Sequence, residues 1–350
     1  MTMSFSSFFV FQSIFCCVQL FVGWCVAGET LTSNRSSIDW PKDLPVYDHI
    51  VIVVEENKDY AEIIDSPAAP YINGVLKKEG ANLTRMFGEE HNSQGNYFWM
   101  FSGSNQTVGF IDHVPNAQNH PNYPFVSSNL GFQLIRNGLT FKGYSEGLPE
   151  IGFTGDASPD RLYARKHVPW ISFSNVPNVP TVETSSNLRF ADFPRDAVGF
   201  KTLPTVAFVI PNLKNDMHDG DLKISIPAGD QWLKQNLDAY YQWAKTNNSL
   251  LIVTFDENND KLQYRGLTNP FVKPDDEFRL DLQNQIVTIF AGAHIKPGDY
   301  PEVSGVTHVN ILRTIEAMYG LPKSGAQQPN AAGGGISDDA IVTDLFLSVK

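Results

Sequence analysis

Four short apolar runs constrain the fold of this chain more than any other feature. They lie at residues 49–54 (HIVIVV), 205–210 (TVAFVI), 250–255 (LLIVTF) and 285–291 (QIVTIFA). Each run is rich in β-branched residues and shows no alternation with polar residues, which is typical of strands covered on both faces. Helical patterns at residues 230–245 and 309–319 lie between or after them. We therefore predict an α/β fold, a three-layer α/β/α sandwich around a mainly parallel central sheet.

The remaining chain fits one domain. Residues 109–202 are rich in Asn, Pro, Ser and Phe, with one helical pattern at 129–137. We expect this region to be an irregular excursion that caps the site rather than a separate domain. Residues 324–335 (SGAQQPNAAGGG) have the composition of a flexible loop. The length of 350 residues is compatible with a single domain over 29–350.

The N-terminal segment predicts export. Residues 1–28 contain no charged side chain, residues 8–27 are mostly apolar, and the segment ends in the small residues of VAG. This pattern indicates a secretory signal peptide, although the usual basic residue before the apolar run is missing. A membrane anchor is the alternative, disfavoured by the polar residues Gln12, Ser13 and Gln19. We therefore expect an extracellular or cell-wall protein with no stable membrane association.

Other features of the composition agree with this expectation. All three cysteines lie within the first 28 residues, so the exported chain would have neither a disulfide nor a catalytic thiol. Sequons at Asn34, Asn82, Asn105 and Asn247 fit a glycoprotein. The net charge of −12 argues against nucleic acid as a partner and means that an anionic substrate needs a locally positive site.

Polar side chains follow three of the four apolar runs. Residues 55–57 (EEN) follow the first, 212–219 (NLKNDMHD) the second and 256–260 (DENND) the third. Because the carboxyl ends of parallel strands meet at one edge of a sheet, we expect these side chains to lie together. One such segment would usually be an ordinary polar loop, but three favour a site for one divalent cation, Ca²⁺, Mg²⁺, Mn²⁺ or Zn²⁺.

A fourth segment, residues 91–97 (HNSQGNY), precedes an apolar helical stretch. A serine at a helix N-terminus lies beside free backbone N–H groups and the positive end of the helix dipole, which favour a bound phosphate. Ser93 alone would more often be an N-cap than a nucleophile. Its neighbour His91 and the metal-like segments favour the nucleophile. Asp230, before the helical pattern at 230–245, is predicted to be an N-cap rather than a ligand.

Taken in order, these motifs resemble the phosphoesterase family that joins acid phosphatases with bacterial and plant phospholipases C, a branch of the alkaline-phosphatase-like fold. The resemblance extends from about residue 47 to residue 346. It rests on the pair Glu56-Asn57, on residues 91–97, which are similar to His-Pro-Ser-x-Pro-Asn-Tyr, on the Pro-Asn…Asn-Asp-Met-His stretch at 211–218, on Asp256-Glu257, and on His308 before the last helical pattern.

The resemblance implies a mechanism and a set of site residues. The cation would be held by Glu56, Asn57, Asp256 and Glu257. Ser93 would attack phosphorus and form a phosphoserine intermediate. Three histidines would contact phosphoryl oxygens or protonate the leaving group: His91, His218 and His308. A protonated pair, His218 and His308, would favour activity on the acid side of neutrality. The substrate-binding residues implied are His167, Asn96 and Asn212.

Departures from the family pattern bear on the choice of branch. Asn92 and Gly95 replace the two prolines that flank the serine, and Asp-Glu-Asn-Asn-Asp replaces the Asp-Glu-His-Gly-Gly of the phospholipase branch. The expected function is a secreted, metal-dependent acid phosphatase acting on small-molecule phosphate monoesters. One alternative is a phospholipase C or phosphodiesterase with an apolar rim formed by Phe98, Trp99, Phe110, Phe125 and Trp170. The other is a secreted binding protein whose catalytic site has decayed.

Overall fold

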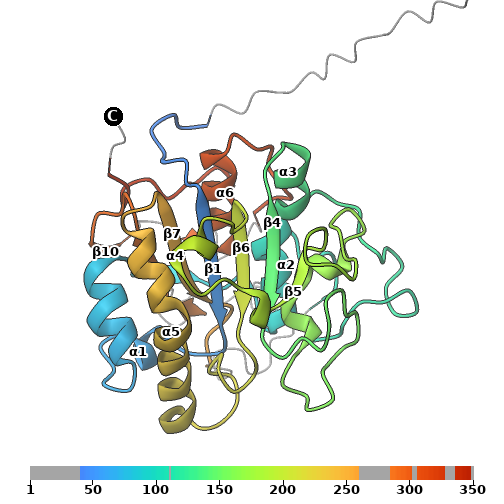
Figure 1. Ribbon diagram of the computed structural model, residues 1–350, viewed down its shortest axis with the longest axis horizontal. Coiled ribbons are helices and arrows are strands. Elements are labelled where there is room, and N and C mark those ends of the chain that lie inside the picture. The colour runs from blue at the N-terminus through green and yellow to red at the C-terminus, as the bar shows by residue number, and fades with distance from the viewer. Residues whose placement is uncertain (1–39, 110–111, 260–283, 302–305, 328–335, 348–350) are drawn as a thin grey trace, which may run out of the picture. The chain divides into compact units, whose positions relative to one another are not determined.

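The computed structural model describes residues 40–109, 112–259, 284–301, 306–327 and 336–347. Its main sheet has eight strands in the order β10-β2-β9-β7-β1-β6-β4-β5 (Figure 1). Their bounds are β1 His49–Glu55, β2 Ala81–Leu83, β4 Phe141–Ser145, β5 Asn187–Arg189, β6 Val206–Ile210, β7 Ser249–Phe255, β9 Thr288–Gly292 and β10 Gly298–Tyr300. Within this sheet β9 runs antiparallel to both neighbours, and the other pairs are parallel. The predicted mainly parallel sheet is confirmed.

The fourth apolar run is shared between two sheets. Its first residues form β8 (Gln285–Ile286), which pairs with β3 (Met86–Phe87) in a three-stranded sheet completed by β11 (Val306–Thr307). After Val287 the chain enters the main sheet as β9.

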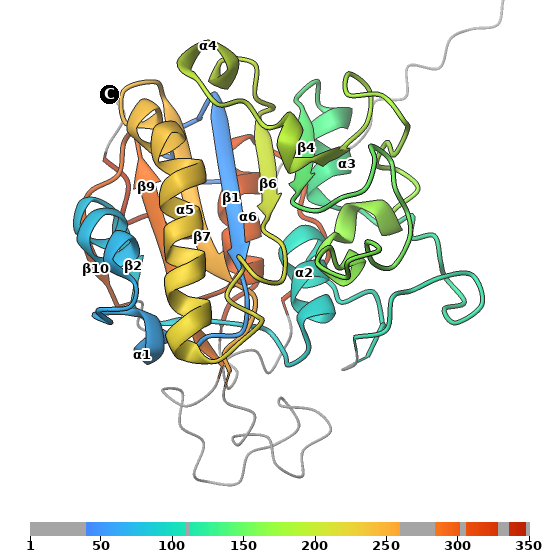
Figure 2. The ribbon, with the colours of Figure 1, turned by 60° about the horizontal axis from the view of Figure 1, so that its bottom comes forward.

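Helices cover both faces of the main sheet, which gives the predicted three layers. On one face lie α2 (Ser93–Ser102), α3 (Leu130–Arg136) and α6 (His308–Met318). On the other lie α5 (Leu222–Ala244), α1 (Tyr60–Ile63) and α4 (Ala197–Phe200), as Figures 1 and 2 show. The described residues also form four short helical segments: η1 (Ile72–Lys77), η2 (Arg165–His167), η3 (Pro169–Ser172) and η4 (Phe190–Asp192).

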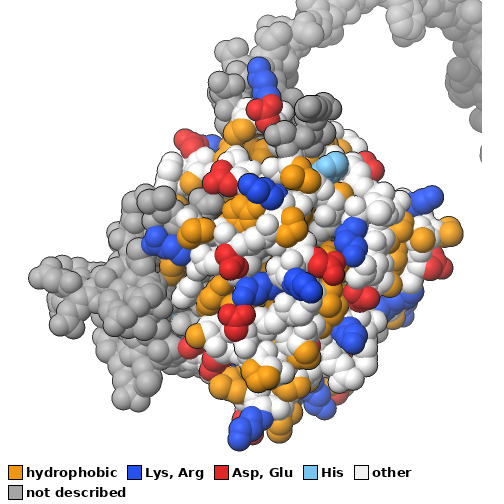
Figure 3. All heavy atoms as spheres, turned by 90° about the vertical axis from the view of Figure 1, so that its left-hand side faces the viewer, with side chains coloured by type: hydrophobic (Ala, Val, Ile, Leu, Met, Phe, Trp, Pro, Cys, Tyr) orange, Lys and Arg blue, Asp and Glu red, His pale blue; other side chains and the backbone are white. Residues whose placement is uncertain are grey.

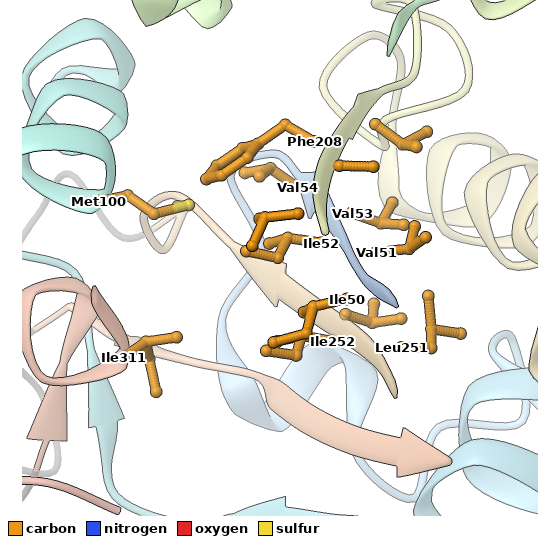
Figure 4. Packing of buried hydrophobic residues seen from close by; sticks show 14 of the residues in the cluster. Ile50, Val51, Ile52, Val53, Val54, Met100, Phe208, Leu251, Ile252 and Ile311 are labelled. Atoms are coloured by element: carbon orange, nitrogen blue, oxygen red, sulfur yellow. The ribbon is translucent and has the colours of Figure 1, made fainter. Parts of the chain in front are cut away.

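The central strand β1 is apolar throughout because both of its faces are covered. Figure 4 shows Ile50 and Ile52 on the face toward Met100 of α2 and Ile311 of α6, while Val51 and Val53 point to the opposite face. The five residues from Ile50 to Val54 are at most 1% exposed. Burial of this kind is the main favourable term in folding, at roughly 25 cal/mol per Å² of apolar surface.

The middle region is less irregular than expected. It supplies β4 and β5 to the edge of the main sheet, and α3 matches the helical pattern at 129–137. Asn129 caps α3 by accepting a hydrogen bond from the Phe132 amide at 2.9 Å. Much of the remainder is loops and the short segments η2 and η3.

Helix α5 begins eight residues before the predicted start, with Asp221 as its N-cap. The prediction that Asp230 is an N-cap of this helix is wrong. Asp230 lies inside α5, and its carboxylate accepts hydrogen bonds from the amides of Tyr71 and Ile72 at 3.0 and 2.8 Å. It therefore satisfies free N–H groups at the start of η1 instead.

Charges of both signs are mixed on the face that contains β10 and α1, where acidic and basic side chains lie interspersed (Figure 3). None of the helices in the described part of the chain combines the length and apolarity needed to cross a membrane. The predicted signal peptide and the sequon at Asn34 lie outside the described residues.

Candidate active site

Three buried carboxylates meet where β1, β6 and β7 end. Glu56 follows β1, Asp256 follows β7, and Asp216 lies in the loop after β6. Backbone hydrogen bonds join the three segments, since the Glu56 amide donates to the Asp216 carbonyl at 2.7 Å and the Asp256 amide to the Glu55 carbonyl at 3.0 Å. All three acidic residues are completely buried. The parallel sheet thus gathers the predicted acidic segments at one edge.

Ser93 lies beside this cluster as the first residue of α2. Its hydroxyl donates a hydrogen bond to Glu56 Oε2 at 3.0 Å. The preceding residue, Asn92, has a φ of 97° and donates its amide hydrogen to Glu257 Oε2 at 2.8 Å. His91 Nδ1 lies 3.1 Å from the same oxygen. Glu257 therefore holds the turn that presents Ser93, while Glu56 contacts the hydroxyl itself.

Tyr97 and Asp216 belong to the same cluster, although the sequence reasoning did not assign them a role. Tyr97 donates to Glu56 Oε1 at 2.5 Å, and its ring stacks on His167 with centroids 4.9 Å apart. His167 Nε2 lies 3.3 Å from Glu56 Oε1, and its Nδ1 lies 3.9 Å from Asp216 Oδ2. Tyr97 is four residues after Ser93, so the helical period places it on the same face, a signal that could have identified it.

The electrostatics of the cluster favour a cation. Burial, together with mutual repulsion, raises the pKa values of Glu56, Asp216 and Asp256 well above those of ordinary carboxyl groups. Asp216 Oδ2, Asp256 Oδ2 and Asn57 Oδ1 are buried without a hydrogen-bond partner. Buried polar atoms normally find partners, and a divalent cation would satisfy all three oxygens and offset the repulsion.

These atoms fit a hard cation by chemistry, with one restriction. Among the residues that the structure describes, no group of three or more His, Cys, Asp and Glu side chains is arranged to hold a metal ion. The amide oxygen of Asn57 and the hydroxyl of Ser93 would therefore have to contribute to the ligand set. Asn57 adopts a φ of 49°, and its amide hydrogen bonds to Asp256 Oδ1 at 3.2 Å.

The predicted histidines differ in exposure. His308 begins α6 and is buried, with Nε2 2.9 Å from the Phe255 carbonyl oxygen. Burial lowers its pKa to about 4, so above that pH its ring is neutral and the expected protonated pair does not form. The side chain of His218 is 30% exposed, and its Nδ1 lies 2.9 Å from Asp219 Oδ1. His218 is thus more exposed to solvent than His308.

The model of the Phosphoesterase family matches residues 66–322. The chain belongs to this family. It is 43% identical over 282 residues to the phosphatidylinositol-3-phosphatase of Mycobacterium tuberculosis, covering 81% of this chain and 80% of that protein. It is 28% identical over 288 residues to a probable acid phosphatase of Kluyveromyces lactis, covering 80% of this chain and 60% of that protein.

The fold comparison agrees with this assignment. A solved protein of the alkaline phosphatase superfamily from Vibrio parahaemolyticus superposes with a TM-score of 0.53 at 9% identity, covering 86% of this chain and 74% of that one. The predicted family and alkaline-phosphatase-like fold are confirmed, and the chain is a phosphoric ester hydrolase. This finding opposes the alternative of a decayed binding protein.

Two other predicted residues contact protein atoms around the phosphoesterase site. Asn96 Oδ1 accepts from the amides of Glu89 and Glu90 at 2.9 and 3.0 Å, which fastens the loop before Ser93 to α2. Asn212 Oδ1 accepts from the Lys214 amide at 3.1 Å. The substrate-binding role of both asparagines stays a prediction.

The structure explains one departure from the family pattern. Glu90 is buried and accepts hydrogen bonds from Trp99 Nε1 at 3.2 Å and Asn105 Nδ2 at 3.0 Å. A Cβ atom at position 95 would lie 1.5 Å from Glu90 Oε1, so the carboxyl group occupies the space that the family's proline would need. Only glycine fits there while Glu90 keeps this position.

The expected apolar rim is not formed by the described aromatic residues. Phe98, Trp99, Phe125 and Trp170 are all buried, and Phe98, Phe125 and Trp170 belong to the hydrophobic core rather than to an exposed opening. Phe110 lies outside the described residues. Among the exposed large apolar side chains, those that follow His218 most closely along the chain are Leu222 and Ile224, at the start of α5.

Proposed function

We propose that this phosphoesterase hydrolyses phosphate monoesters with Ser93 as nucleophile and one divalent cation, in the manner of the acid phosphatases. The observation that carries the proposal is the 3.0 Å hydrogen bond from the Ser93 hydroxyl to the buried Glu56, at the N-terminus of α2. A phosphate group at this position would be favoured by the helix dipole.

The chain's own residues suggest which ligands would hold the cation. The proposed ligands are Glu56, Asn57 and Asp256. Asn57 Oδ1 and Asp256 Oδ2 are buried without a hydrogen-bond partner, as is Asp216 Oδ2, which supports the proposal. Glu257 would position Ser93 through its contacts with the Asn92 amide and His91. When bound, the cation would neutralise phosphoryl oxygens and lower the pKa of the Ser93 hydroxyl.

Each step of the reaction then has a candidate residue. Ser93 Oγ attacks phosphorus, and its hydrogen bond to Glu56 Oε2 gives the departing proton an acceptor. With His218 Nδ1 beside Asp219, the other ring nitrogen is the one that can protonate the leaving oxygen. Water attacks the phosphoserine by the reverse path, and His167 beside Glu56 would orient the phosphoryl group.

The test measures phosphate release from p-nitrophenyl phosphate between about pH 4 and 8, with and without a chelator. Ser93→Ala should lose nearly all turnover. Ser102→Ala is the matched control, since this buried serine lies in the same helix and bonds to the Phe98 carbonyl at 2.9 Å. Near-normal turnover in well-folded Ser93→Ala would show that another group is the nucleophile, and turnover that survives chelation would remove the cation from the proposal.

A lipid monoester is the second candidate substrate. The Mycobacterium tuberculosis relative is named for a phosphoinositide. Near His218, the start of α5 exposes 38% of Leu222 and 64% of Ile224, which could contact acyl chains. Release of phosphate from phosphatidylinositol 3-phosphate in vesicles should then fall in Ile224→Ser, with no change on p-nitrophenyl phosphate. Release of diacylglycerol from phosphatidylcholine would instead favour the phospholipase C alternative.

We also propose that the chain is exported through residues 1–28 and glycosylated at Asn247. Asn82 is fully buried in β2, and Asn105 Nδ2 is bonded to the buried Glu90. Asn247 is partly exposed after the end of α5, and its Nδ2 donates to the Trp243 carbonyl at 2.7 Å, a bond that the N–H left after glycosylation can keep. A glycan at Asn247 is therefore compatible with the fold. In an Asn34→Gln background, protein secreted from a eukaryotic host should lose mass with a glycosidase, and Asn247→Gln should abolish that change. A glycan found at Asn82 would contradict the proposal.

A further inference from the structure

An ion pair lies beside the nucleophile. Lys166 Nζ, from η2, contacts Asp112 Oδ2 at 2.6 Å. The other oxygen of this carboxylate, Asp112 Oδ1, accepts a hydrogen bond at 3.1 Å from the amide of Gln94, the residue that follows Ser93. Two segments of the middle region thus meet at the first turn of α2, and an anionic group already occupies that position.

The partners of Asp112 are those that a phosphoryl group would use. A backbone N–H at a helix N-terminus and a lysine ammonium are both common phosphate ligands. The ammonium of Lys166 lies close enough to Glu56, the residue bonded to Ser93, to oppose the rise in the pKa of that carboxyl. The side chains of Asp112 and Lys166 are 32% and 20% exposed, so an incoming anion can reach them.

We propose that Asp112 occupies a phosphoryl-binding position formed by Lys166 and the Gln94 amide, and that the substrate displaces it when it reaches Ser93. Lys166 is then a substrate-binding residue, and Asp112 is a competing anion carried by the protein itself. The inference rests on the proposed role of Ser93 as the nucleophile.

Removal of the competing charge should strengthen phosphate binding. Asp112→Asn keeps the shape of the side chain and the acceptor for the Gln94 amide, but it frees Lys166. The Kd for inorganic phosphate should fall by up to about fivefold. A partly exposed ion pair usually changes an equilibrium constant by no more than this, and here the ion pair favours the phosphate-free state. KM for p-nitrophenyl phosphate should fall with it.

A purely structural role gives the opposite result. If Asp112 only stabilised the start of α2, its replacement would lower the Tm and would leave phosphate binding unchanged or weaker. The matched control is Asp196→Asn, because Asp196 caps α4 through the amides of Val198 and Gly199 at 3.0 and 2.8 Å. This control should lower the Tm without strengthening phosphate binding.

The experiment is titration calorimetry with inorganic phosphate, in one buffer and at one cation concentration, on the whole protein. The variants are Asp112→Asn, Lys166→Met and the double mutant. Lys166→Met should weaken binding, and in its background Asp112→Asn should change the Kd by less than about twofold, because the two residues act together. Asp112→Ala replaces the Asn variant if the latter does not fold.

The outcomes separate the inference from the proposed function. An unchanged or raised Kd in Asp112→Asn overturns the inference even where turnover depends on Ser93. Turnover that survives in Ser93→Ala overturns the proposed function, whereas tighter phosphate binding by Asp112→Asn still supports the anion position at Lys166. Absence of phosphate binding in both wild type and Asp112→Asn also overturns the inference.

Discussion

The stability of the protein should depend on pH through Glu90. Burial raises the pKa of this carboxyl group from 4.5 to about 8 in the folded state. Between these two values the folded protein keeps the proton that the unfolded chain has lost. The folded state binds more protons, so the free energy of unfolding falls as the pH rises. The contribution of Glu90 is fully present below pH 4.5 and is lost as the pH rises through about 8.

The perturbation that isolates this effect is Glu90→Gln. Glutamine has nearly the same shape and keeps an acceptor for Trp99 Nε1 and Asn105 Nδ2, but it does not titrate. Relative to wild type, the variant should gain up to ~1.4 kcal/mol in unfolding free energy for each pH unit within the window. The gain across the whole window is at most ~5 kcal/mol by the same relation.

The assay is urea unfolding at several pH values across the window, with the difference between variant and wild type plotted against pH. Burial raises the pKa of Glu316 to about 7, and because Glu316 is not among the groups that act on Glu90, its contribution cancels in this difference. The charge of Glu89 is one of the causes that raise the pKa of Glu90, so the contribution of Glu89 cancels only in part. Glu150→Gln serves as the control, because Glu150 is exposed. Parallel pH profiles for Glu90→Gln and wild type would refute the reasoning.

Three further predictions concern single contacts. Ile52→Ala should lower the free energy of unfolding by ~2–5 kcal/mol, because a cavity forms beside the central strand. Chemical denaturation measures this loss, and a loss below that range would mean that the core repacks. Tyr97→Phe removes the hydrogen bond to Glu56 and should lower kcat by about 10- to 100-fold with a similar Tm, whereas unchanged turnover would assign Tyr97 to packing alone. Arg313→Met leaves the buried Glu316 without its ion-pair partner at 2.6 Å and should destabilise the fold by ~3–5 kcal/mol, seen as a lower Tm; an unchanged Tm would show that Glu316 finds another partner.

The central sheet could be predicted because its main strands contain little besides β-branched and aliphatic residues. Strand β4 (FKGYS), which lies between β6 and the edge strand β5, could not be predicted, since it contains a lysine and a glycine. Gly143 is required by packing, because a Cβ there would lie 2.1 Å from Trp170 Cζ2. The early start of α5 was hidden by Pro227 and Gly229, which usually end helices. Gly229 is needed because Met217 packs against it, with Cγ 2.4 Å from where a Cβ would be.

The candidate site divides in the same way. Ser93, Glu56 and Asp256 could be predicted as site residues, because their motifs occur along the chain in the order that the family shows. The parallel sheet explains why the three residues lie together. The contact of Lys166 with Asp112 could not be predicted, because it joins residues 54 positions apart in a region without periodic pattern. The neutral state of His308 depends on burial, which the sequence around it does not reveal.

The close approach of Glu90 to Gly95 links two positions that sequence motifs treat as independent. A graft of the family's proline-bearing segment over residues 91–97 would place a ring where the Glu90 carboxyl lies, unless position 90 became smaller in the same step. A library that varies position 95 alone should therefore return glycine almost exclusively, while one that varies both positions should also recover the proline form. Residues 90 and 95 should therefore change together. Relatives with proline at the position of Gly95 should have a residue other than glutamate at the position of Glu90.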